Sequence, residues 1–157
     1  MDKGNVRNSD PNDIADELHQ ISYHDESQAQ AYVYFKIMGP SKQDAETVFG
    51  TPEAKLKEEL ESAETVFEKA EKTIEISRSD KMPPSKKEEA LADGCLLGED
   101  EAEAHVHYGR LDDSRLVEKL GKPVSRIEPA NERADKIIEK AYELMEFRNE
   151  YKGFQVA

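Results

Sequence analysis

The chain has 157 residues, of which 35 are acidic and 22 are basic, so its formal net charge is −13. Hydrophobic and charged residues each make up 36% of the sequence, a balance that favours small or elongated helical structures over a thick globular core. An acidic protein repels phosphate backbones, which argues against direct nucleic-acid binding. The apolar run that ends at Phe35 is too short for a membrane-spanning helix.

The cysteine content and the N-terminal residues bear on localisation. The single cysteine, Cys95, cannot form an intrachain disulfide, and residues 1–9 lack the apolar stretch of a secretory signal. We therefore expect a reducing, cytoplasmic setting, or incorporation into a particle assembled there.

The first third of the chain predicts a polar N-terminal arm followed by short helices. Residues 1–9 show no periodicity, and Asp10-Pro11 supplies an N-cap and a first-turn proline for a helix over 10–21. Residues 31–38 are rich in aromatic and β-branched side chains, but the following Gly39-Pro40 favours a helix there as well.

A pentapeptide, Ala-Glu-Thr-Val-Phe, occurs at 45–49 and again at 63–67. Ser41 to Asp44 resembles a capping box for a short helix that ends at Gly50, and Thr51-Pro52 can start a new helix. The two copies are therefore predicted to lie on separate helices.

The next segment has the most regular pattern of the sequence. Apolar residues alternate at spacings of four and three, which predicts one long helix over 52–76 with a heptad seam. The seam residues are Leu56, Leu60, Ala63, Phe67, Ala70 and Ile74.

Three further helices are predicted in the second half. Ser85 to Glu88 forms a capping box for a helix, which either continues or breaks near Gly98. A short helix over 113–120 follows, and Pro129 precedes a last helix that Asn131 caps. The apolar stripe of the first of these helices consists of Leu91, Cys95, Gly98, Ala102 and Val106.

Together these patterns predict an all-α fold. We expect a single helical-bundle domain of six or seven helices over 10–152, between the polar arm 1–9 and a short extended tail, 153–157. Gly153 is expected to stop the last helix, so that Phe154 and Val156 can dock on a neighbouring surface.

Carboxylates are clustered in the second half of the sequence. They are Glu99, Asp100 and Glu103, followed by Glu132 and Asp135. This spacing resembles the acidic pattern of the all-α nucleotide pyrophosphohydrolases of the MazG type. The resemblance implies Mg²⁺ held by these carboxylates against a substrate diphosphate. The alternative is a solvated acidic face that needs no cofactor.

The histidines and the cysteine carry weaker chemical signals. His105 and His107 each follow a glutamate by four residues, but neighbours two apart on a regular helix diverge too far to bind one ion. Cys95 has no neighbouring base, which indicates a buried structural residue.

The preferred functional interpretation is a non-catalytic acidic helical protein that acts as a subunit of a larger assembly, such as a virus-particle connector or ring component. We expect protein partners, including further copies of the chain, and no membrane. The alternatives are the Mg-dependent pyrophosphohydrolase and an acidic DNA mimic that inhibits a nucleic-acid-binding protein. The expected interaction residues are Leu56, Leu60, Phe67, Ile74, Phe154 and Val156.

Overall fold

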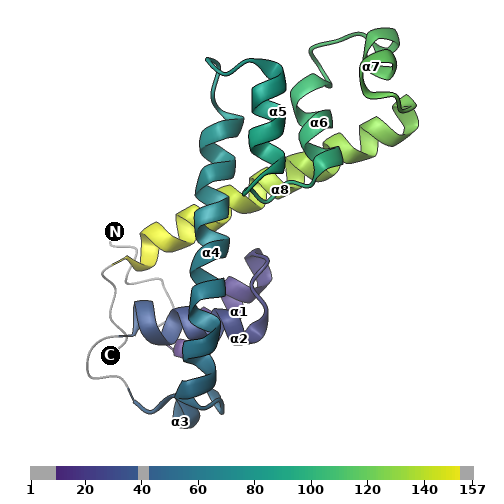
Figure 1. Ribbon diagram of the computed structural model, residues 1–157. Coiled ribbons are helices and arrows are strands. Elements are labelled where there is room, and N and C mark those ends of the chain that lie inside the picture. Colours follow the sequence, from purple (N-terminus) through teal and green to yellow (C-terminus); the bar gives the residue numbers. More distant parts are fainter. Residues whose placement is uncertain (1–9, 39–42, 153–157) are drawn as a thin grey trace, which may run out of the picture. The chain divides into compact units, whose positions relative to one another are not determined.

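The computed structural model describes residues 10–38 and 43–152, and these residues form helices and connections without a strand (Figure 1). The all-α prediction is confirmed. The predicted arm 1–9 and tail 153–157, with Phe154 and Val156, lie outside the described residues. In chain order the elements are α1 (Pro11–Ile21), α2 (Glu26–Tyr32), η2 (Val33–Ile37), α3 (Ala45–Phe49), α4 (Glu53–Ser77), α5 (Pro84–Ala92), α6 (Glu99–His107), α7 (Asp113–Leu120) and α8 (Val124–Tyr151).

The described residues group into two compact units. The first contains the residues up to Glu68 together with those from Glu143 onward, and the second is Lys69–Tyr142. The long helices α4, of 25 residues, and α8, of 28 residues, contribute to both. Within the described ranges, no helix is both long enough and apolar enough to span a membrane.

Local capping explains where the first helices of the first unit begin. The Asp10 side chain accepts the Asn12 N–H and caps α1, as the sequence predicts. Asp25 and Gln28 form a reciprocal capping box, so α2 begins at Glu26, earlier than the predicted residue 31.

Residues 33–37 form a π-helical turn, η2, that continues α2. The Met38 N–H donates to the Val33 carbonyl at 2.9 Å, which closes the wider turn. The predicted helical character of 31–38 is confirmed, but the periodicity gave no sign of the π geometry. Such turns occur frequently at functional sites.

The helix α3 is capped by Asp44, whose side chain accepts the Thr47 N–H. Ser41, the first residue of the predicted capping box, lies outside the described residues. It ends at Gly50, which adopts the left-handed conformation at φ 72° and so favours glycine. The next helix, α4, begins at Glu53, and the two pentapeptide copies lie on separate helices as predicted.

In the second unit, the start of α5 differs from the prediction. The helix begins at Pro84 after the N-cap Pro83, so the predicted capping box from Ser85 to Glu88 is wrong. Residues 93–98 separate α5 from α6, which places Cys95 on a connection and not on a continuous helical stripe. Cys95 is nevertheless buried in the hydrophobic cluster of this unit.

The start of α8 is the largest difference from the sequence analysis. This helix begins at Val124 and runs through Pro129, so the prediction of a helix capped by Asn131 is wrong. Residues on both sides of the proline are buried in one cluster, and this packing offsets the missing backbone donor. The cluster consists of Ala104, Leu116, Ile127 and Ala130.

Candidate functional site

The carboxylates that the sequence suggested as magnesium ligands lie on the second unit, and Lys122 forms ion pairs with two of them. Asp100 and Glu103 are near the start of α6, three residues apart on the same helix. The Lys122 Nζ atom lies 2.5 Å from Asp100 Oδ1 and 2.5 Å from Glu103 Oε1. The side-chain ammonium therefore holds the position between the two carboxylates where a cation would bind.

The same contacts shift the protonation equilibria of these groups. The hydrogen bond and the charge of Lys122 lower the pKa of the Asp100 carboxyl. In return, the hydrogen bonds to Asp100 and Glu103 raise the pKa of Lys122. Both shifts favour the ion pair of the Asp100 carboxylate with the Lys122 ammonium.

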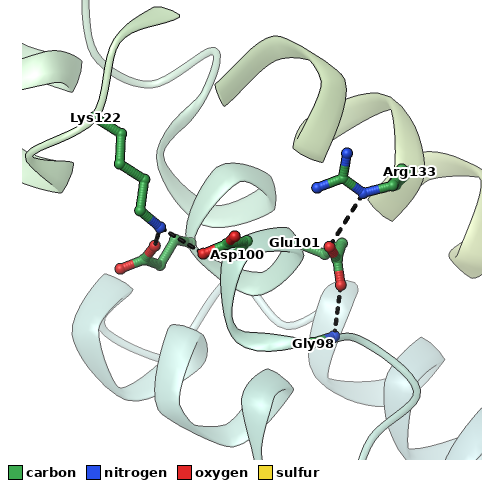
Figure 2. A network of polar contacts seen from close by, with 6 residues as sticks. Gly98, Asp100, Glu101, Lys122 and Arg133 are labelled. Carbon is green, nitrogen blue, oxygen red and sulfur yellow. Dashed lines mark hydrogen bonds and ion pairs between the residues drawn. The ribbon is translucent and has the colours of Figure 1, made fainter. Parts of the chain in front are cut away.

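Glu101, which the sequence analysis did not single out, is also held within the fold (Figure 2). Its Oε1 atom accepts the Gly98 N–H at 2.9 Å, and its Oε2 atom accepts a hydrogen bond from Arg133 Nε at 3.2 Å. The first contact caps α6, and the second connects α6 to α8. Because the Glu101 carboxylate lies over Gly98, an added Cβ there would lie 2.5 Å from it.

The remaining suggested ligands, Glu99, Glu132 and Asp135, are exposed. Within residues 10–38 and 43–152, no group of three or more His, Cys, Asp or Glu side chains is arranged to hold a metal ion. The structure thus brings Asp100 and Glu103 together around a lysine and supplies no third ligand from this set.

His107 is 1% exposed and forms a closed polar cluster. Its Nε2 atom lies 2.7 Å from Glu88 Oε1, and Arg110 Nη2 lies 2.7 Å from its Nδ1 atom. An arginine only donates, so Nδ1 accepts and Nε2 carries the hydrogen that goes to Glu88. Both ring nitrogens are occupied, which favours a structural role for this histidine.

Cys95 belongs to the same unit. Burial raises the pKa of its thiol, while the Thr73 hydroxyl and Lys72 oppose the shift. A raised thiol pKa disfavours the reactive thiolate, so the environment fits a structural cysteine.

The seam residues of α4 are not buried equally. Leu56 and Phe67 are buried, whereas Leu60 and Ile74 are partly exposed. Thr73, at 0% exposure, takes the inward position that the heptad assigned to Ile74. A straight helix of 3.6 residues per turn drifts against a heptad repeat, which explains the change of phase near the end of α4.

A second candidate site is a cavity of about 620 Å³ on the first unit. It lies between the end of α2 with η2, the middle of α4 and the end of α8. Acidic side chains come from α4 and basic ones from η2 and α8. The polar lining consists of Tyr32, Lys36, Glu61, Glu64, Thr65, Glu68, Arg148, Asn149, Tyr151 and Lys152.

Three aromatic residues, Tyr32, Phe67 and Tyr151, line this cavity. The Tyr32 ring lies 4.4 Å from that of Phe67, which in turn lies 6.4 Å from Phe147, and Phe147 lies 4.7 Å from Tyr151. Burial raises the pKa of Tyr32, and the positive charge of Arg148 opposes this shift.

The walls of the cavity carry both charge signs. Lys36 Nζ pairs with Glu64 Oε2 at 3.1 Å. The Tyr32 hydroxyl makes no hydrogen bond to any residue that the structure describes. The spacing of Glu61, Glu64 and Glu68 by three and four residues places them on one face of α4, next to the seam. This spacing is the sequence pattern that could have indicated the acidic wall.

No family model matches the chain, and no curated protein or solved structure resembles it significantly.

Proposed function

We propose that the chain is a non-catalytic helical interaction protein, a subunit of a larger assembly, which binds a segment of a protein partner in the cavity of its first unit. The observation that carries this proposal is a cavity lined both by aromatic residues and by side chains of both charge signs. A connector or ring component of a virus particle is one concrete example of such a subunit.

The chemistry of the walls suits a polypeptide partner. Tyr32 offers a hydroxyl and an aromatic face, and both are enriched in protein interfaces. Glu61 and Glu68 lie on one wall and Arg148 and Lys152 on another, so the site offers acceptors and donors to backbone and side-chain groups. A volume of about 620 Å³ is large enough for several side chains.

The pyrophosphohydrolase alternative has less support from the geometry. Lys122 pairs with both Asp100 and Glu103, and among the residues that the structure describes no third carboxylate is grouped with the exposed Glu132 and Asp135 to hold a metal. The acidic DNA mimic has only the net charge of −13 in its favour.

Light scattering on the purified chain tests the proposal for self-assembly. We expect a mass above the 17.8 kDa of one chain. This mass should rise with salt concentration, because salt screens the repulsion between chains of charge −13.

Charge reversal on the cavity wall then tests the site. Glu68→Lys should reduce the mass, while the control Glu75→Lys, on α4 but outside the cavity, should leave it unchanged. Equal effects of both variants, or of neither, would contradict the assignment of this cavity as the interface.

A further inference from the structure

His24 lies on the connection between α1 and α2 and is 2% exposed. Its Nε2 atom lies 2.7 Å from the backbone carbonyl oxygen of Ala63 on α4, and its ring lies 4.8 Å from that of Phe67. A carbonyl oxygen only accepts, so Nε2 must carry a hydrogen. This bond fastens the α1–α2 connection to α4.

The other ring nitrogen faces a serine. His24 Nδ1 lies 2.8 Å from Ser22 Oγ, and the same Oγ lies 2.7 Å from the Leu18 carbonyl oxygen at the end of α1. Ser22 Oγ also accepts the backbone N–H of His24 at 3.0 Å. Four groups therefore meet in a space closed to solvent.

Counting hydrogens shows that a neutral ring leaves this cluster incomplete. With the ring hydrogen on Nε2, the single hydroxyl hydrogen of Ser22 must serve either His24 Nδ1 or the Leu18 carbonyl. One of the two short contacts then joins two acceptors without a hydrogen, which is costly in a buried site. With hydrogens on both ring nitrogens, every contact has a donor and an acceptor.

We propose that His24 is a buried proton-binding site, in which a second ring hydrogen completes the hydrogen bonds of the cluster at the α1–α2 connection. A proton from solvent binds to His24 Nδ1, and Nδ1–H then donates to Ser22 Oγ. The Ser22 hydroxyl turns away from the ring and donates to the Leu18 carbonyl. The bond from Nε2 to Ala63 is kept in both states, and no bond between heavy atoms changes.

The groups around the ring influence the pH at which His24 binds this proton. Burial lowers the pKa of His24, and the Ala63 carbonyl and the Asp25 carboxylate oppose this shift. Asp25 is held near the ring because it also caps α2, and His19 on α1 donates through Nδ1 to the His24 carbonyl. From α4, the Ala63 carbonyl and the Phe67 ring contact the histidine. Proton uptake therefore requires a pH below the ordinary pKa of a histidine.

His107 provides an internal contrast at similar burial. Its Nδ1 atom faces the Arg110 guanidinium, a donor, so a hydrogen at that position would break the contact. His24 Nδ1 faces a hydroxyl oxygen that can accept. The contacts of His107 thus accommodate one ring hydrogen, whereas those of His24 can accommodate two.

Histidine ring NMR on the full chain, titrated from about pH 8 to about pH 4, tests whether His24 binds this proton. We expect His24 to be in the Nε2–H tautomer at neutral pH and to gain a hydrogen on Nδ1 in acid while the chain stays folded. Ser22→Ala should lower the pH midpoint of proton uptake by His24, because the charged ring loses the Ser22 hydroxyl as its acceptor. Ser22→Thr keeps the hydroxyl and should restore the midpoint.

The opposite direction would overturn the proposal. If Ser22→Ala raises the midpoint or leaves it unchanged, then Ser22 donates to a neutral ring and the count of hydrogens is wrong. An Nδ1–H tautomer at neutral pH would overturn it equally, and this readout uses the unmodified chain. Asp25→Asn keeps a cap on α2 and should lower the midpoint through the lost charge alone.

Discussion

The Thr73 hydroxyl, buried in the second half of α4, accepts the backbone N–H of Leu96 at 2.9 Å. Its own hydrogen goes to the Lys69 carbonyl at 2.6 Å, so donor and acceptor capacity are both used. One side chain thus fixes the connection between α5 and α6, the point at which the sequence left open whether a single helix continues.

Thr73→Val should lower the free energy of unfolding by about 1–3 kcal/mol, because the Leu96 N–H loses its partner at nearly constant side-chain volume. Chemical denaturation followed by circular dichroism measures the loss. Thr73→Ser keeps the hydroxyl and serves as the control, with a smaller loss that reflects only the missing methyl group. Equal losses in the two variants would mean that packing, and not the hydrogen bond, is what Thr73 supplies.

Lys122→Met should destabilise the second unit only modestly, by about 1 kcal/mol or less, since Asp100 is half exposed and solvent screens the pair. The effect should depend on pH. The pKa of Asp100 is lowered in the folded chain, so its contribution is present at neutral pH and is lost as acid protonates the carboxylate. Unfolding of both proteins at neutral pH and in acid measures the difference, which should shrink in acid. A difference that grows in acid would contradict this assignment.

Helix ends with a local cause could be predicted from the sequence. Asp10 before a proline and Gly50 after a helical segment each act through their own backbone geometry or a neighbouring N–H. The Asp25–Gln28 capping box is equally local. Its residue pattern lies within a run of polar residues, which indicated a break between helices instead of a helix start.

Features that depend on distant contacts could not be predicted in this way. The helix α8 continues through Pro129 because Ile127 and Ala130 are buried against residues of other helices. Lys122, in turn, meets Asp100 across 22 residues of sequence, a pairing that no spacing rule indicates. The acidic pattern of the five suggested magnesium ligands could be read from the sequence, but the basic residues that pair with them could not.

The pyrophosphohydrolase alternative makes a sharp prediction of its own. It requires Mg-dependent release of pyrophosphate from nucleoside triphosphates that is lost in the double variant Glu132→Ala/Asp135→Ala. We expect no such release from the purified chain, because the Lys122 ammonium lies between Asp100 and Glu103, where the metal would bind. Release that requires magnesium and disappears in the double variant would replace the proposed function.

The last prediction asks whether the seam residues Phe67 and Leu60 pack within the chain or between chains. Phe67 is buried against His24, Tyr32 and Phe147, so Phe67→Ala should cost about 3–5 kcal/mol of unfolding free energy through lost burial and a cavity. Leu60 is partly exposed, and Leu60→Ala should cost less, below about 2 kcal/mol.

Melting of both variants at two protein concentrations roughly a hundredfold apart then locates each side chain. For Phe67→Ala we expect a lowered melting temperature and the same concentration dependence as the parent chain, because the contacts of Phe67 lie within its own unit. Leu60 lies between chains if the melting temperature of the parent chain rises with protein concentration and that of Leu60→Ala does not. If Leu60→Ala changes neither stability nor the concentration dependence, this position of the seam contributes to neither the core nor assembly.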